Sequence, residues 1–166
     1  MEQVTIAGNA SSIANEGGQF LTFTLGDEEY GIDILKVQEI KGYSAVTRIP
    51  RAPSYVKGMM NLRGTIVPVI DLRSKFGLDL KNCDQFTVII VVLVRGRTLG
   101  MIVDTVSDVL NIPRTDVQAT PDFSNSIDTS FISGMGKSGN KLIILIDVEK
   151  VLGVDELQAI ESTQSS

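Results

Sequence analysis

The sequence has 166 residues, with one Cys, no His and no Trp. A chain of this length can bury a core without a metal or a disulfide, and the missing imidazoles exclude Ser-His pairs, Cys-His pairs and His-ligated metals. The net charge of −5 and the aromatic content of 5% disfavour nucleic-acid binding by the chain as a whole.

The N-terminal part predicts a tail followed by two strands. Residues 1–18 are small and polar, and we expect them to form a flexible tail without a targeting signal. Leu21, Phe23 and Leu25 alternate with Thr, which is typical of a half-buried strand. Residues 30–34 predict a returning strand, after which the apolar phase shifts by one residue and indicates a bulge or bend.

A second hairpin and a short helix follow. Residues 59–63 and 66–70 are predicted to pair around a glycine turn. Pro68 interrupts the second run, which favours an edge strand or a bulge. Asp71 is placed to accept the free N–H groups of a short helix, and Gly77 is placed to end it.

The second half of the chain repeats this plan after a polar linker over residues 78–85. Residues 88–94 and 99–103 predict one hairpin, and residues 131–135 and 142–146 predict another. Matched positions keep an offset of 69 residues at first and 76 later, which indicates an internal duplication. The matched pairs include Gly31 and Gly100, Glu39 and Asp108, Gly58 and Gly134, and Asp71 and Asp147.

The duplication predicts a mainly β fold of two five-stranded barrels that share a hydrophobic core, with short capping helices. We expect a first barrel over residues 19–80 and a second over 86–155, the two being intertwined. Residues 156–166 are expected to form a short C-terminal helix and tail.

Three motifs that invite a catalytic interpretation have simpler explanations. Residues 136–138, Gly-Lys-Ser, lack the earlier glycine of a phosphate loop and fit a hairpin turn. Asp71 and Asp147 could act as a hydrolase acid/base pair, but their equivalent places before short helices favour capping. Cys83 has no His to activate it. We therefore expect no enzyme, no catalytic residue, no metal and no cofactor.

Residues 35–40 instead favour a protein contact. Glu39 shares the inward phase predicted for Val37, and a carboxylate among apolar neighbours needs a partner or water. We expect Val37 and Ile40 to serve as apolar anchors, with Glu39 awaiting a donor. Arg63 at the second hairpin tip is a further candidate because Arg is enriched at interface centres.

The basic side chains are unevenly distributed. Residues 36–75 hold eight basic and two acidic side chains, which fits a solvated face as well as a docking face for a partner. The alternative function is a small β-barrel nucleic-acid module, which would bind single strands in a salt-dependent way.

Several sequence patterns together resemble a known family. They are Phe23-x-Leu25-Gly26-Asp27-Glu28-Glu29-Tyr30-Gly31-Ile32-Asp33-Ile34, then Val37-Gln38-Glu39-Ile40, Asn61-Leu62-Arg63-Gly64 and Ile70-Asp71-Leu72-Arg73. Over about residues 19–155 the chain is similar to the CheW family of bacterial chemotaxis coupling proteins. The same module occurs in the kinase CheA and in CheV, but no phosphotransfer, ATPase or receiver segment accompanies it here, which favours the adaptor.

The resemblance implies SH3-like barrels and a cytoplasmic, non-enzymatic scaffold. Such an adaptor joins the cytoplasmic tip of methyl-accepting chemoreceptors to the regulatory domain of the histidine kinase CheA, at membrane receptor arrays but without membrane insertion. The implied receptor-binding residues are Val37, Glu39, Ile40, Gly58 and Arg63. The implied kinase- or array-binding residues are Gly100, Phe123 and Gly134. No nucleic-acid partner and no cofactor are implied.

Overall fold

The computed structural model describes residues 17–44, 46–79, 84–118 and 131–151, and most of these residues lie in β-strands. The strands are β1 (Gly17–Leu25), β2 (Glu28–Asp33), β3 (Val37–Gly42), β4 (Val56–Leu62), β5 (Thr65–Asp71), β6 (Val88–Val94), β7 (Arg97–Val103), β8 (Thr105–Pro113), β9 (Val117–Gln118), β10 (Ile132–Ser138) and β11 (Lys141–Ile146). Two helices, α2 (Leu72–Lys75) and α3 (Val148–Val151), and two 3-10 turns, η3 (Ile34–Lys36) and η4 (Arg114–Asp116), connect them. The predicted N-terminal tail up to residue 16, Cys83 and the predicted C-terminal helix lie outside the described residues.

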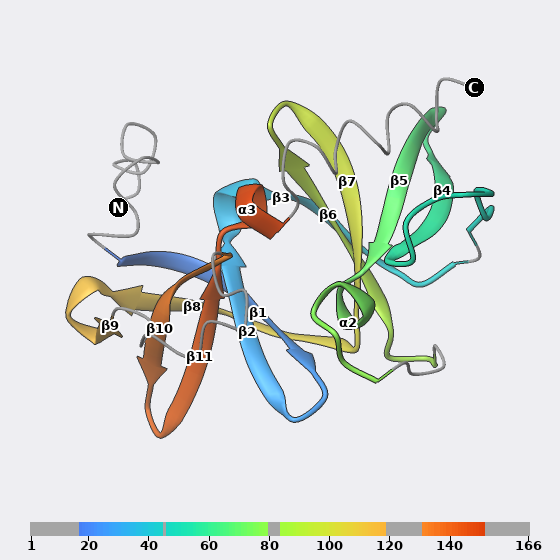
Figure 1. The fold of residues 1–166 in the computed structure, drawn as a ribbon. Coiled ribbons are helices and arrows are strands. Elements are labelled where there is room, and N and C mark those ends of the chain that lie inside the picture. The colour runs from blue at the N-terminus through green and yellow to red at the C-terminus, as the bar shows by residue number, and fades with distance from the viewer. Residues whose placement is uncertain (1–16, 45, 80–83, 119–130, 152–166) are drawn as a thin grey trace.

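The strands form two sheets that lie side by side (Figure 1). One sheet has the order β8-β1-β2-β11-β10-β9, and the other has the order β3-β6-β7-β5-β4. Each sheet therefore combines strands from residues 19–80 with strands from residues 86–155. The two barrels do not correspond to the two predicted ranges, because the halves of the chain exchange strands. The first sheet has six strands rather than five because the two-residue β9 pairs with β10.

The exchange of strands follows the sequence repeat. β2 runs parallel to β11 with Gly31 opposite Leu145, and β7 runs parallel to β5 with Gly100 opposite Val69. These two pairs occupy equivalent positions of the duplication. A Cβ on Gly31 would lie 3.2 Å from the side chain of Leu145, and a Cβ on Gly100 would lie 3.0 Å from that of Ile89. The repeated glycines thus allow a side chain to pack closely over each parallel junction.

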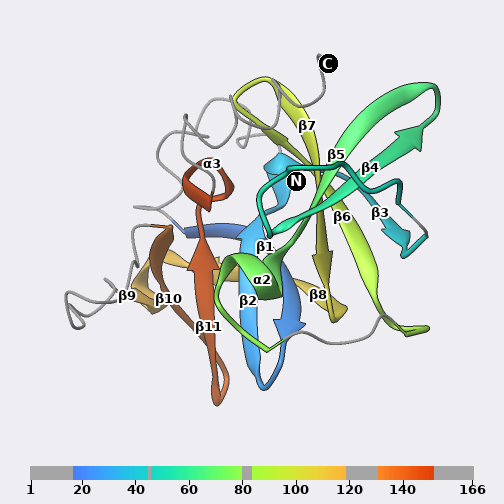
Figure 2. The same cartoon turned by 45° about the vertical axis from the view of Figure 1, so that its right-hand side comes forward.

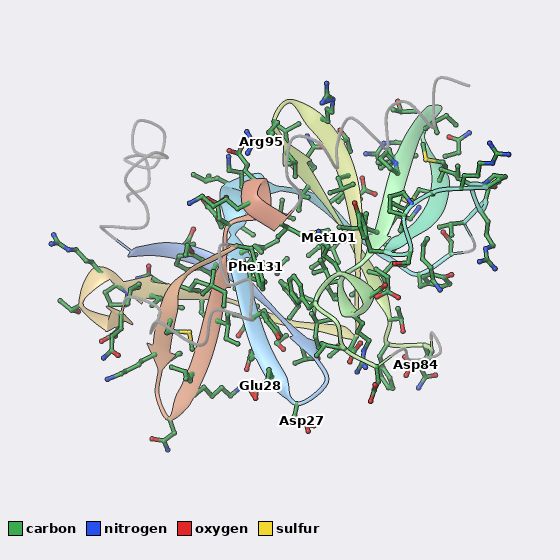
Figure 3. The ribbon with its side chains drawn as sticks, viewed as in Figure 1. Asp27, Glu28, Asp84, Arg95, Met101 and Phe131 are labelled. Carbon is green, nitrogen blue, oxygen red and sulfur yellow. The ribbon has the colours of Figure 1, made fainter. Side chains whose placement is uncertain are left out.

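The largest apolar cluster lies between the two sheets. It joins Phe23 and Ile32 from the six-stranded sheet to Ile90 and Met101 from the five-stranded sheet. Figure 3 shows Met101 and Phe131 between the sheets. Each sheet also has one smaller apolar cluster of its own. The cluster of the five-stranded sheet consists of Met60, Val67, Val69, Ile89, Val91 and Ile102, and that of the six-stranded sheet of Phe20, Ile112, Ile143 and Leu145. The two barrels therefore share a core, as the sequence predicts, and each buried side chain adds about 1.5–3 kcal/mol.

The helix caps form as predicted. The Asp71 carboxylate accepts from the Arg73 backbone N–H at 3.0 Å, and the Asp147 carboxylate accepts from the Glu149 N–H at 3.0 Å. Gly77 takes a φ of 75° after α2, a left-handed conformation that Gly adopts at no steric cost. Two equivalent carboxylates that each cap their own helix need no catalytic role.

Pro68 does not mark an edge strand. β5 lies between β4 and β7, and Pro68 pairs with Met59 on the β4 side. The parallel pairing with β7 begins only at Val69, so Pro68 precedes this ladder. The bulge in this hairpin lies in β4, between Val56 and Gly58. Among the described residues, no helix is long and apolar enough to span a bilayer.

Candidate contact surface

β3 forms the outer edge of the five-stranded sheet and carries three of the predicted contact residues. Val37 lies opposite Val92, and Glu39 lies opposite Val91, so two steps along β3 correspond to one step along β6. This bulge places Val37 and Glu39 on opposite faces, because directly opposed residues share a face and successive residues alternate. The prediction that Glu39 shares the phase of Val37 is therefore wrong. Val37 packs on the core between the barrels, whereas Glu39 shares the other face of β3 with Val91, and its hydrogen bond to Arg63 lies at the surface.

Glu39 is paired within the chain. Arg63 Nη2 donates to Glu39 Oε1 at 2.6 Å, across the gap between β3 and the tip of the β4–β5 hairpin. The Glu39 side chain is 24% exposed and the Arg63 side chain 74%. Donation from the guanidinium holds the pKa of the Glu39 carboxyl below its ordinary value. The expectation that Glu39 awaits a donor is thus wrong for the free protein, since Arg63 supplies one.

A tight turn aims Arg63 at this position. Arg63 has a φ of 52° and Gly64 a φ of 89°, as in the two-residue turns that suit the twist of a hairpin. The Asn61 side-chain oxygen accepts from the Gly64 N–H at 2.7 Å and fixes the turn. The guanidinium keeps most of its surface in water, so an incoming acidic or carbonyl group can reach it beside Glu39.

Apolar side chains are exposed on the same sheet. Ile40 on β3 is 43% exposed and Ile66 on β5 is 57% exposed, although both are large β-branched residues. The duplication repeats this feature on the other sheet, where Val109 and Leu142 at the equivalent positions are also exposed. Ile40 and Glu39 lie on opposite faces of the edge strand, so a partner that covers this edge can meet both apolar and charged groups, as protein contacts usually combine.

Gly58 is a buried positioning residue rather than an exposed contact. It has a φ of 153°, and a Cβ there would lie 2.1 Å from the Thr47 carbonyl oxygen and 3.2 Å from the Arg48 Cα. Thr47 and Met59 exchange two backbone hydrogen bonds of 2.8 Å beside it. The absent side chain therefore lets the segment before β4 lie directly on the strand.

The predicted kinase- or array-binding residues do not form one cluster. Gly100 lies in β7 of the five-stranded sheet, and Gly134 lies in β10 of the six-stranded sheet. Both are buried strand residues, and neither belongs to a turn. A Cβ on Gly134 would lie 3.1 Å from the Gln118 carbonyl oxygen. The absent side chain of Gly134 therefore allows β9 to pack closely on β10, as that of Gly58 allows Thr47 to pack on β4. Phe123 lies outside the described residues.

Sequence reasoning missed the ion pair that joins the two sheets. Arg73 in α2 donates from Nε and Nη2 to the two Asp104 carboxylate oxygens at 2.7 and 2.6 Å. Asp104 also accepts from the Gly26 backbone N–H at 2.9 Å, and the Arg73 and Asp104 side chains are only 15% and 14% exposed. The pair connects the helix after the five-stranded sheet to the β1–β2 turn of the other sheet.

The duplication places a second ion pair at the equivalent junction. Glu149 corresponds to Arg73 at the offset of 76, and its carboxylate accepts from Lys36 Nζ at 2.8 Å. This contact lowers the pKa of Glu149. Arg95 in the β6–β7 turn donates to the Glu149 carbonyl oxygen, and Figure 3 shows Arg95 beside α3. Aligning the repeats shows that one position carries Arg in the first half and Glu in the second, but it does not identify the partner of either charge.

An aromatic row adds a further connection between the sheets. The ring centroids of Phe23 and Tyr30 lie 5.8 Å apart, those of Tyr30 and Phe76 5.7 Å, and those of Phe76 and Phe131 4.5 Å. Offset and tilted ring pairs at these distances add about 0.5–1.5 kcal/mol each beyond their buried area. Phe23 and Tyr30 lie in strands of the six-stranded sheet and Phe131 precedes another, whereas Phe76 follows α2 after the five-stranded sheet, so Phe76 joins the two barrels.

The described residues contain no group of three or more His, Cys, Asp or Glu side chains that could hold a metal. A shallow concavity of about 360 Å³ lies in the segment between β3 and β4.

Comparisons with known proteins agree with these features. Residues 19–156 match the family model described as a CheW-like domain. The chain is 46% identical to the chemotaxis protein CheW of Klebsiella aerogenes, over 94% of this chain and 95% of that protein. It is 35% identical to the chemotaxis protein CheW of Rhizobium meliloti, over 90% of this chain and 97% of that protein.

A solved structure shares the fold. The crystal structure of the scaffolding protein TtCheW from Thermoanaerobacter tengcongensis superposes with a TM-score of 0.78 at 35% identity, covering 84% of this chain and 95% of that one. The similarity extends over both sheets in sequence and in space.

Proposed function

The chain belongs to the family of CheW-like domains, and from this premise we propose that it is a chemotaxis scaffold that works by binding rather than by catalysis. In this role it couples methyl-accepting chemoreceptors to the histidine kinase CheA, in the cytoplasm and at membrane receptor arrays. The relatives' names, chemotaxis protein and scaffolding protein, support the role. The observation that carries it is that one open edge strand, β3, presents the Glu39–Arg63 pair on one face and the half-exposed Ile40 on the other.

We assign the receptor contact to the five-stranded sheet. Ile40 supplies exposed apolar area, and Arg63 supplies a charge that is paired but still open to water. A helical receptor tip can bury Ile40 and exchange hydrogen bonds with the ion pair, as in the docking of an amphipathic helix. Val37 and Gly58 support this contact indirectly. Val37 packs on the core between the barrels, and Gly58 allows the segment that contains Thr47 to pack on β4.

The kinase or array contact is proposed to involve Gly100, Gly134 and Phe123. Because Gly100 and Gly134 are buried, we assign them to shaping β7 and β10 rather than to touching a partner. The shared core, the ion pair between Arg73 and Asp104 and the aromatic row fix the barrels relative to one another. A rigid body of this kind holds two bound partners in a defined geometry, which is what a coupling scaffold requires.

Charge reversal tests the receptor contact. Glu39→Lys and Arg63→Glu each place two like charges together at the hairpin tip, so we expect at least tenfold weaker binding of a receptor-tip fragment measured by calorimetry. Kinase binding and the thermal midpoint should change little, because both groups lie at the surface. Lys137→Glu, an exposed hairpin position on the other sheet, is the matched control. Receptor binding by either variant at the wild-type affinity would exclude the assignment.

A pull-down from a chemotactic bacterium tests the function itself. The wild-type chain should retain both a chemoreceptor and a histidine kinase, identified by mass spectrometry. Retention of neither would refute the scaffold function.

A further inference from the structure

The segment between β3 and β4 contains a concavity of about 360 Å³ that the receptor contact described above does not use. Its lining residues are Arg48, Ile49, Pro50, Arg51, Ala52, Pro53, Ser54, Val56 and Lys57. The segment projects beside β4 and β5 at the end of the molecule that lies away from the six-stranded sheet (Figures 1 and 2). More of its exposed lining is polar than apolar, and three exposed cationic side chains, Arg48, Arg51 and Lys57, belong to it.

These three cations are not neutralised within the described part of the chain. No described acidic group forms an ion pair with Arg48, Arg51 or Lys57. The sequence contains no Asp or Glu between Glu39 and Asp71, while five basic residues lie in that interval. Like charges around one concavity raise the local positive potential, so an anionic group is favoured there.

Several features restrict the backbone of the segment. Arg51 has a φ of 66°, in the left-handed region that non-glycine residues rarely adopt. Pro50 and Pro53 fix their own φ angles on either side, and the Val56 N–H donates to the Pro53 carbonyl oxygen at 2.9 Å. A concavity that is already ordered loses less conformational entropy on binding.

Gly58 allows the chain on one side of the concavity to pack against β4. The backbone N–H and carbonyl groups of Thr47, the neighbour of Arg48, form two hydrogen bonds with those of Met59. A side chain on Gly58 would collide with Thr47 and prevent this contact. The concavity is thus fastened to the same strand that leads to Arg63, so it lies on the barrel to which the receptor contact is assigned.

We propose that this concavity, lined from Arg48 to Lys57, is a docking site for an acidic segment of a protein partner. The inference rests on the proposed scaffold function and deepens it by naming the partner's chemistry. Carboxylates of the segment pair with Arg48, Arg51 and Lys57, and the stems of its side chains lie on Ile49 and Val56. Charge complementarity is the reason for this choice of occupant.

A nucleic acid fits the surface less well. The chain carries a net charge of −5 although this region is basic, so the rest of the molecule repels a long polyanion. The lining contains no aromatic side chain on which a base could stack. An acidic peptide needs only the few charges that the concavity supplies.

The test uses the full chain labelled with ¹⁵N and two helical peptides of the same length. One peptide carries two Glu residues four apart in its centre, and its twin carries Gln at both places. We expect the Glu peptide to shift the amide signals of residues 48–57 and to bind at least tenfold more tightly than the Gln twin. Arg51→Glu and Lys57→Glu should each weaken it at least tenfold, while Arg114→Glu, an exposed control on the other sheet, changes it less than twofold.

Four outcomes would overturn the inference. They are equal affinity for the two peptides, equal losses in Arg51→Glu and in the Arg114→Glu control, tighter binding of a single-stranded oligonucleotide at the same amides, and displacement of the peptide by an equal concentration of inorganic phosphate. Failure here is distinguishable from failure of the scaffold function, since the pull-down of receptor and kinase reads that function independently of the peptides.

Discussion

Gly58→Ala should destabilise the five-stranded barrel by an amount that the geometry allows us to estimate. The added Cβ would lie 2.1 Å from the Thr47 carbonyl oxygen and 2.7 Å from its carbonyl carbon, whereas ordinary contacts begin at 3.4 Å. Both obstacles are backbone atoms, so rotating a side chain cannot relieve the overlap. The segment that contains Thr47 must move away by about 1 Å or more, given these atomic contact distances.

That movement breaks the two hydrogen bonds between Thr47 and Met59, each 2.8 Å long. Two backbone hydrogen bonds contribute about 1 kcal/mol each. An Ala at the φ of 153° adds about 1 kcal/mol of backbone strain. We therefore expect the free energy of unfolding to fall by about 3 kcal/mol, which lowers the thermal midpoint of a domain of this size by roughly 10 °C.

Urea denaturation and calorimetry of the two proteins provide the measurement. Gly42→Ala on β3 is the matched control, because a Cβ there meets no atom within 4 Å. The control should change the unfolding free energy by less than about 0.5 kcal/mol, as surface substitutions usually do. If Gly58→Ala is as stable as Gly42→Ala, then Thr47 is not seated on Gly58, and the positioning role assigned to this glycine is refuted.

Two further predictions concern the ion pairs. Asp104→Ala removes three hydrogen bonds and leaves the Arg73 guanidinium largely buried without its partner, so denaturation should show a loss of about 2–4 kcal/mol. Asp27→Ala in the exposed β1–β2 turn is the control, and equal losses would contradict the role of the pair. Arg63→Gln should raise the pKa of Glu39 toward the ordinary Glu value of about 4.3 in an NMR titration. Because folding lowers the pKa of Glu39, the pair stabilises the folded protein at a pH above the ordinary Glu pKa, and this stabilisation is lost as the pH falls through the lowered pKa. If the pKa of Glu39 does not change in Arg63→Gln, the Arg63 contact is not the cause of its lowering.

The local structure follows from neighbouring residues and could be predicted from the sequence. Asp71 and Asp147 cap helices through contacts two residues away, and the glycine turns at hairpin tips need only their own backbone freedom. Alternation of apolar residues predicts the strands, but it loses the phase where a bulge inserts a residue. At Val37 and Glu39 this error reversed the face assigned to one side chain.

The sequence by itself determined four hairpins, the caps, the duplication and the existence of a core large enough for two barrels, but it assigned no range to β3, β8 or β9. The tertiary structure alone decided that β1 and β2 pair with β8 and β11 rather than with the strands of their own half. The reason is physical: equivalent strands of a repeat carry the same apolar pattern, so either pairing satisfies the local sequence, and only the packed core distinguishes them. The same holds for Glu39 with Arg63 and for Arg73 with Asp104, since a charge-charge contact depends on distance in space, which chain order does not give.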